Sequence, residues 1–257
     1  MSKITILGSA SGIPAPGRAH ACFLLETDEG SFLFDAGEGC ASSLLRHGID
    51  HDRIFNIFIT HMHPDHVIGL PMVLQLMHLS NREIPLNVYL PAEAVESTRR
   101  YLETLYLFPG RFAFELHLDP IRPNPIYRDE TVVISAYQNR HLMGYDRHIS
   151  EDHLANQMQS YSLVILAAGK KIYYSGDVGG AEDIREVLSE PDVAVTECMH
   201  LPPEELMALL AEKQVPRVVL THVPPRLDNK DAYLLQLAEK HGVQDVLVAR
   251  DGLSLHL

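Results

Sequence analysis

The stretch that decides the fold is Thr60-His61-Met62-His63-Pro64-Asp65-His66, which follows an apolar run at 54–60. Three imidazoles and one carboxylate fall within six residues, at the end of a predicted buried strand and the beginning of a predicted helix. Neutral imidazole nitrogens and carboxylate oxygens are the ligands that zinc accepts in catalytic sites. We therefore interpret the three histidines and the aspartate as metal ligands. A surface histidine cluster with Asp65 as a helix N-cap is the alternative interpretation.

Length and composition limit the kind of protein. The chain has 257 residues, enough for one large domain with a substantial core, so we predict a single domain over residues 1–257. Hydrophobic residues make up 46% and charged residues 21%, which argues against disorder. The chain has no apolar run of membrane-spanning length and no signal-peptide pattern at its N-terminus, so we expect a cytoplasmic protein that does not enter a membrane. The net charge of −13 weighs against a broad nucleic-acid surface, and the three cysteines are expected to be buried free thiols.

Strands and helices alternate along most of the chain. Strands are predicted at 4–7, 21–26, 31–34, 54–60, 86–90, 161–167, 171–175, 193–196, 217–220 and within 246–257. Helices are predicted at 38–47, 64–80, 92–105, 181–188, 203–213 and 231–240. The alternating pattern at 111–136, with Pro120, Pro123 and Pro125, predicts a hairpin or meander. This alternation of strands and helices favours an α/β fold with two sheets inside and helices outside, a four-layer αββα sandwich.

The pattern H-x-H-x-D-H after such a strand resembles the signature of the metallo-β-lactamase superfamily. Further stretches resemble its remaining motifs in the same order: Phe34-Asp35-Ala36-Gly37-Glu38-Gly39, His141, Tyr174-Ser175-Gly176-Asp177 and Leu220-Thr221-His222. The resemblance implies that Asp35 supports the metal loop from outside the ligand set. It also implies two metal sites, formed by His61, His63 and His141 and by Asp65, His66 and His222, with Asp177 bridging them.

Each of the later residues has another interpretation when it is taken alone. His148 and His153 lie close to His141 in the sequence and could replace it as a ligand. Asp177 could be an ordinary turn residue, and His222 could be structural. Their joint appearance in the expected order favours the metal interpretation.

Within the superfamily, the chain resembles the ribonuclease Z group and its small phosphodiesterase relatives. The glycine-containing turn at 7–14 and Arg226, which follows the last histidine motif, carry this resemblance. Arginine suits a phosphate oxygen because its planar fork donates two hydrogen bonds, although Arg226 could equally be a solvated charge. The resemblance implies that Glu197 and His200 assist proton transfer to the leaving oxygen, with a shortened spacer between them. Their alternative roles are a helix cap and a loop residue.

The resemblance implies an enzyme, a hydrolase in which a hydroxide that bridges two divalent metal ions attacks a phosphodiester. Zinc is the expected metal, with manganese or iron as alternatives. Ribonuclease Z enzymes usually carry a long arm that grips tRNA, but only 35 residues separate His141 from Asp177 here, and 147–159 is at most a short, non-basic lid. RNA is therefore a less favoured substrate. A hydrolase of thioesters, lactones or sulfate esters, a di-iron redox protein and an inert metal-binding module are the alternatives, and a homodimer is typical of the group.

Overall fold

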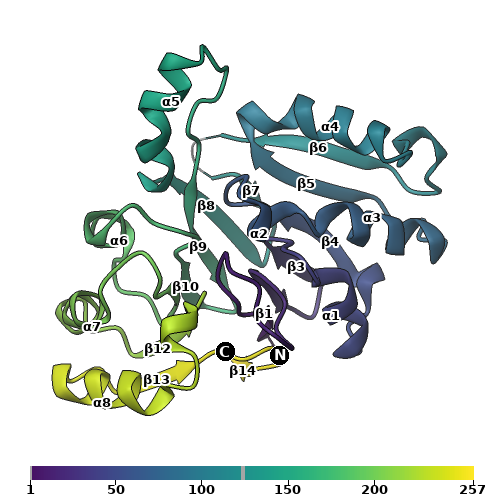
Figure 1. The fold of residues 1–257 in the computed structure, drawn as a ribbon. Helices are drawn as coiled ribbons and strands as arrows, with labels where there is room; N and C mark the ends of the chain where they lie inside the picture. Colours follow the sequence, from purple (N-terminus) through teal and green to yellow (C-terminus); the bar gives the residue numbers. More distant parts are fainter. Residues whose placement is uncertain (1, 123–124) are drawn as a thin grey trace. The chain divides into compact units, whose positions relative to one another are not determined.

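The computed structural model describes residues 2–122 and 125–257, and the chain divides into two compact units. The first unit comprises Met1–Ile121 and Arg250–Leu257, and the second comprises Arg122–Ala249. Each unit contains one seven-stranded mixed sheet and its own helices (Figure 1). In the part of the chain that is described, no helix is long and apolar enough to cross a membrane.

The sheet of the first unit has the strand order β14-β1-β2-β3-β4-β5-β6. Its strands are β1 (Lys3–Gly8), β2 (Cys22–Glu26), β3 (Ser31–Phe34), β4 (Ile54–Phe58), β5 (Leu86–Pro91), β6 (Leu116–Ile121) and β14 (Ser254–His256). Neighbours from β14 to β3 are antiparallel, and those from β3 to β6 are parallel. Parallel pairing matters for the site, because the carboxyl ends of β3 and β4 meet at one edge of the sheet.

The helices of the first unit are α1 (Cys40–Arg46), α2 (Pro64–Val67), α3 (Leu70–Leu79) and α4 (Val95–Thr104), with short 3-10 turns at His51–Arg53, Ala92–Ala94 and Pro109–Arg111. The single helix predicted at 64–80 is wrong, because the chain breaks at Gly69. A Cβ on Gly69 would lie 2.0 Å from the carbonyl oxygen of Gly37. The Gly69 N–H also donates to the carbonyl of Ala36 at 2.9 Å. The loop at 60–66, which carries the predicted ligands, is called the metal loop below. The break lets this loop approach the turn after β3.

A fully buried arginine anchors the beginning of β4. The Arg82 guanidinium donates to the carbonyls of His51 and Ile54, each at 2.8 Å, and to that of Ile84 at 2.7 Å. Burial lowers the pKa of Arg82, but these acceptors compensate the desolvated charge. The strand that leads into the metal loop is thus held at its start by side-chain hydrogen bonds as well as by sheet pairing.

The sheet of the second unit has the strand order β13-β12-β11-β10-β9-β8-β7. Its strands are β7 (Tyr127–Arg128), β8 (Val132–Gln138), β9 (Tyr161–Ala167), β10 (Lys170–Tyr174), β11 (Val193–Glu197), β12 (Arg217–Thr221) and β13 (Asp245–Val248). Neighbours from β7 to β10 are antiparallel, and those from β10 to β13 are parallel. The hairpin predicted at residues 161–175 is confirmed by the β9–β10 pair.

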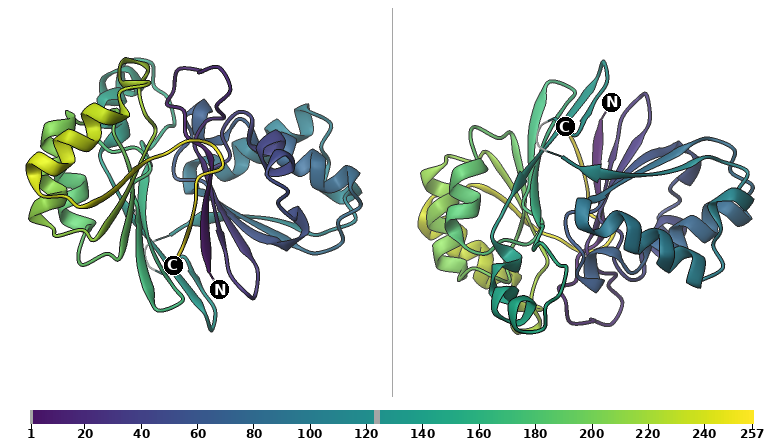
Figure 2. Two further views of the ribbon diagram at one scale, coloured as in Figure 1. Left: turned by 90° about the horizontal axis from the view of Figure 1, so that it is seen from below. Right: turned by 90° about the horizontal axis from the view of Figure 1, so that it is seen from above.

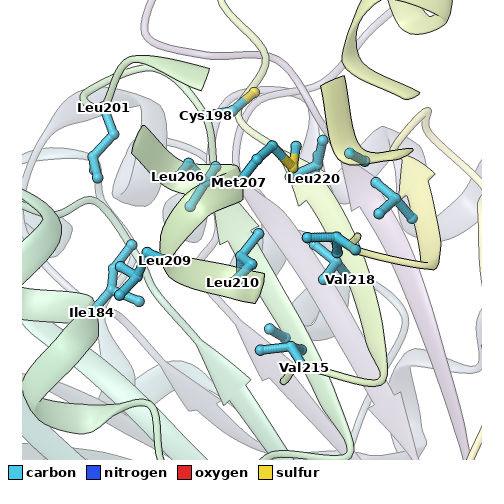
Figure 3. Close-up of a cluster of buried hydrophobic side chains, with 14 of the residues drawn as sticks. Ile184, Cys198, Leu201, Leu206, Met207, Leu209, Leu210, Val215, Val218 and Leu220 are labelled. Carbon is cyan, nitrogen blue, oxygen red and sulfur yellow. The ribbon is translucent and has the colours of Figure 1, made fainter. Parts of the chain in front are cut away.

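The helices of the second unit are α5 (Asp146–Glu151), α6 (Ala181–Val187), α7 (Pro203–Glu212) and α8 (Asp231–His241), with 3-10 turns η4 (His141–Tyr145) and η5 (Pro225–Leu227). Figure 2 shows α6, α7 and α8 on one face of their sheet. Figure 3 shows how α7 packs there: Leu206, Met207 and Leu210 lie beside Val218 and Leu220 of β12. Apolar side chains at helical spacing thus bury the parallel half of the sheet.

One prediction about strand placement needs correction. The stretch 111–136 does not form one meander, because β6 pairs in parallel with β5 in the first sheet, whereas β7 and β8 form a hairpin in the second. Pro123, which supported that prediction, lies outside the described residues. The prediction of strands within 246–257 is confirmed, and these strands lie in different sheets: β13 pairs with β12, and β14 pairs with β1. The prediction of an α/β fold with two sheets and flanking helices is confirmed, and so is that of three buried free cysteines. The prediction of a single domain stays a prediction.

Candidate metal centre

The metal loop of the first unit begins where β4 ends and is fixed by Asp35, the residue after β3. One carboxylate oxygen of Asp35 accepts the backbone N–H of Thr60 at 2.7 Å, and the Thr60 hydroxyl lies 3.0 Å from both oxygens. The other oxygen, Oδ2, accepts Nδ1–H of His66 at 2.9 Å. Asp35 is fully buried and has a φ of +56°, a strained conformation for an aspartate. Asp35 therefore holds the metal loop, in the position that the sequence motif predicted for it.

The predicted ligands of this loop lie together. The imidazole of His61 lies 4.8 Å from that of His63 and 4.1 Å from that of His66, measured between ring centroids. Because His66 donates Nδ1–H to Asp35, its lone pair is on Nε2, which lies 3.6 Å from a carboxylate oxygen of Asp65. An ideal Cβ on Gly12 would lie 3.4 Å from the same carboxylate, so the glycine-containing turn lies beside Asp65.

The second unit brings its predicted ligands together around Asp177. Asp177 follows β10, His222 follows β12, and His141 begins η4 after β8. Oδ2 of Asp177 lies 3.3 Å from Nε2 of His222 and 3.7 Å from Nε2 of His141. Two ligands at about 2.1 Å from one tetrahedral cation would be about 3.4 Å apart. The donor types and their separations therefore fit divalent cations in this unit.

His148 and His153, the alternatives to His141, are both exposed to solvent. The side chain of His141 is only 7% exposed and lies beside Asp177. Geometry within the second unit thus favours His141 as the histidine that accompanies this carboxylate.

Glu197 and His200 lie together despite the shortened spacer. Oε1 of Glu197 accepts Nδ1–H of His200 at 2.9 Å, and Oε2 accepts the backbone N–H groups of Met199 and His200 at 2.9 and 2.8 Å. Oε1 also accepts the N–H of Val178, which joins this carboxylate to the Asp177 loop. The pair is thus held in one orientation, and its role in proton transfer stays a prediction.

Possible ligand atoms of Asp177, Glu197 and His200 also lie within 4.8 Å of one another, close enough to hold one metal ion. Nδ1 of His200 lies 3.8 Å from Asp177, but this nitrogen carries the proton that Glu197 accepts. A nitrogen that carries a proton has no lone pair for a cation. Nδ1 of His200 is therefore unavailable to a cation while Glu197 accepts its proton.

Arg226 is exposed in η5, and its guanidinium donates to the backbone carbonyl of Met199 at 3.1 Å. This contact holds the arginine next to the segment that carries His200. Its predicted role in substrate binding stays a prediction. Asn139 and Asp183 were not predicted from the sequence, and they contact the segments that carry His141 and Asp177. Neither residue stands in a recognisable motif, so no signal in the sequence points to them.

Comparison with known proteins agrees with this fold. A ribonuclease Z of Methanosarcina acetivorans is 25% identical, and the alignment covers 100% of this chain and 98% of that protein. The short form of human tRNase Z superposes with a TM-score of 0.75 at 22% identity, covering 99% of this chain and 98% of that one. The metallo-β-lactamase-fold protein YhfI of Bacillus subtilis superposes with a TM-score of 0.78 at 18% identity, covering 99% and 98%. The structural matches establish the fold alone.

The two sheets with their flanking helices and the histidine–carboxylate clusters at the strand ends define a metal-dependent hydrolase of the metallo-β-lactamase fold, similar in sequence to ribonuclease Z. Within this class, the chain belongs to the family described as anti-Pycsar protein Apyc1, whose family model matches residues 2–243.

Proposed function

We propose that the two units act as one hydrolase domain and supply one centre for two divalent cations. We propose zinc as the metal, with manganese or iron as alternatives. The cluster in each unit offers neutral imidazoles and carboxylates, the ligands of catalytic zinc. The proposed sites are His61, His63 and His141 for one cation and Asp65, His66 and His222 for the other, with Asp177 shared. The convergence of donors within each unit supports this assignment.

We propose that the substrate is a phosphodiester. The hydrogen-bonded pair of Glu197 and His200 carries this proposal, because an alkoxide leaving group needs a proton and this pair lies beside Asp177. Arg226, held against the neighbouring backbone, suits a phosphate oxygen. The ribonuclease Z name of the sequence relatives is in line with this substrate class.

Bound cations supply a nucleophilic water at neutral pH and stabilise charge on the phosphoryl oxygens. In the proposed mechanism, Asp65 orients that water and accepts its proton. His200 is fixed through Nδ1 by Glu197, so its Nε2 is the atom that donates a proton to the leaving oxygen. Arg226 holds a non-bridging oxygen of the substrate.

We propose a small phosphodiester rather than tRNA. The 35 residues between His141 and Asp177 include α5, β9 and β10, which leaves little chain for a tRNA-gripping arm. The net charge of −13 also disfavours a long polyanion. Another ester class, such as a thioester, lactone or sulfate ester, is the second candidate. The homodimer and the cytoplasmic location stay predictions.

The test is metal analysis of the purified protein coupled to hydrolysis assays before and after chelation. We expect two cations per chain, hydrolysis of bis(p-nitrophenyl) phosphate that chelation abolishes, and recovery on addition of zinc. A chromogenic carboxylic ester, a thioester, a lactone and an aryl sulfate serve as the comparison panel. Preferential hydrolysis of any of these would replace the phosphodiester proposal, and activity that survives complete chelation would refute the metal mechanism.

Replacing His200 with alanine tests its role as the acid. We expect turnover of a dinucleoside monophosphate, which has an alkoxide leaving group, to fall about 10²-fold more than turnover of bis(p-nitrophenyl) phosphate. The physical reason is that p-nitrophenolate leaves without a proton. Parallel measurement of kcat for both substrates checks the difference, and equal losses would remove His200 from this role.

A further inference from the structure

We propose that Asn139 and Asp183 are positioning residues that lock the segment carrying His141 onto the loop carrying Asp177. The inference rests on the proposed function, since it has a consequence for metal binding only if His141 and Asp177 are ligands. All of these residues lie in the second unit. Their contacts are therefore set within one compact body.

Asp183 joins the two segments directly. It stands in the first turn of α6, and one carboxylate oxygen accepts the N–H of Gly179 at 2.7 Å. The same oxygen accepts the backbone N–H of Arg140 at 3.0 Å, and the other accepts Nε–H of Arg140 at 2.6 Å. A residue that only capped its own helix would need the first contact alone. The contacts to Arg140 reach the residue next to His141.

Asn139 joins the same segments on the other side. Its amide nitrogen donates to the backbone carbonyl of Asp177 at 2.9 Å and to the Ser162 hydroxyl at 3.2 Å. Its amide oxygen accepts the N–H of His141 at 3.2 Å. The side chain is buried, with 5% of the residue exposed, so replacing it leaves buried polar groups without these partners.

The backbones of Arg140 and Gly179 are in direct contact beside these hydrogen bonds. An ideal Cβ on Gly179 would lie 2.7 Å from both the carbonyl carbon and the oxygen of Arg140, so only glycine allows this approach. The hydrogen bonds and this packing together set the distance of 3.7 Å between Nε2 of His141 and Oδ2 of Asp177. Residues that orient ligands in this way typically change metal affinity when they are replaced.

The test measures zinc affinity of the full chain by competition with a chromogenic chelator. We expect Asp183→Asn and Asn139→Ser each to weaken zinc binding by about 10- to 100-fold. Asp192→Asn is the matched control, because Asp192 also accepts a backbone N–H, that of Lys171 at 2.8 Å, but at the start of β10, away from Asp177. This control should bind zinc as the unmodified chain does.

A second measurement separates positioning from general stability. In a His141→Ala background, Asp183→Asn should cost less zinc affinity than it does in the unmodified chain, because one of the two ligands that it positions is gone. Circular dichroism of the metal-free variants shows which of them fold. If Asp183→Asn does not fold, the milder substitution Asn139→Ser tests the inference instead. Folded variants with zinc affinity within twofold of the unmodified chain, or a fully additive loss in the His141→Ala background, would overturn the inference. Failure of the proposed function looks different: the unmodified chain would bind no zinc, or His141→Ala alone would leave binding unchanged.

Discussion

Asp177→Ala should abolish hydrolysis and reduce the metal content of the protein below two cations per chain. Oδ2 of Asp177 lies 3.3 Å from Nε2 of His222 and 3.7 Å from Nε2 of His141, so one carboxylate oxygen lies close to both imidazoles. Its removal takes a negative charge away from the place where two divalent cations are proposed to lie close together. Loss of this stabilisation is worth several kcal/mol, which corresponds to about 10⁴-fold in rate.

Metal content by elemental analysis and kcat/KM for bis(p-nitrophenyl) phosphate measure this effect. Asp192→Ala is the control in the same unit, because it removes an aspartate that binds a backbone N–H and a lysine but no histidine. We expect the control to keep its metal and its rate. Two tightly bound cations in Asp177→Ala with unchanged kcat/KM would exclude Asp177 as the shared ligand.

Asp65→Ala should lower turnover by at least about 10³-fold while the chain still folds. Asp65 lies beside His66, with 3.6 Å between its carboxylate and Nε2 of the ring. The hydrogen bonds that hold the metal loop, from Thr60 and His66 to Asp35, do not involve Asp65. The substitution therefore removes the group proposed to orient and deprotonate the water and leaves the scaffold of the loop in place.

Single-turnover and steady-state rates measure this loss, and thermal unfolding checks the fold. Asp50→Ala is the control in the first unit, because Asp50 is exposed and caps a 3-10 turn through the N–H of Asp52. It should leave the rate unchanged. A folded Asp65→Ala protein with full activity would refute the proposed mechanism.

The sequence was most informative where the chemistry is local. His61, His63, Asp65 and His66 fall within one turn, so their spacing alone predicted a cluster, and the structure places them together. The hairpin at 161–175 was equally predictable, because its turn and its two apolar strands are contiguous. Local signals of this kind depend on side-chain periodicity and turn residues, which the sequence displays directly.

Pairings between distant segments were not predictable in the same way. Residues 111–136 were predicted to form one hairpin or meander, but β6 and β7 belong to different sheets, because the sheet that a strand joins depends on partners far along the chain. The break of the predicted helix at Gly69 depends on the carbonyl of Gly37, more than thirty residues earlier. The local sequence pattern identifies neither of these partners.

The order of histidines and aspartates along the chain predicted the class of protein and the candidate metal ligands, since donor chemistry belongs to the side chains themselves. Only the tertiary structure decided that Glu197 fixes Nδ1 of His200 across a shortened spacer. It alone showed that Asn139 and Asp183 tie the His141 segment to the Asp177 loop. The physical reason is that a hydrogen bond depends on distance and direction in space, and these are set only when β8, β9, β10 and β11 assemble into one sheet.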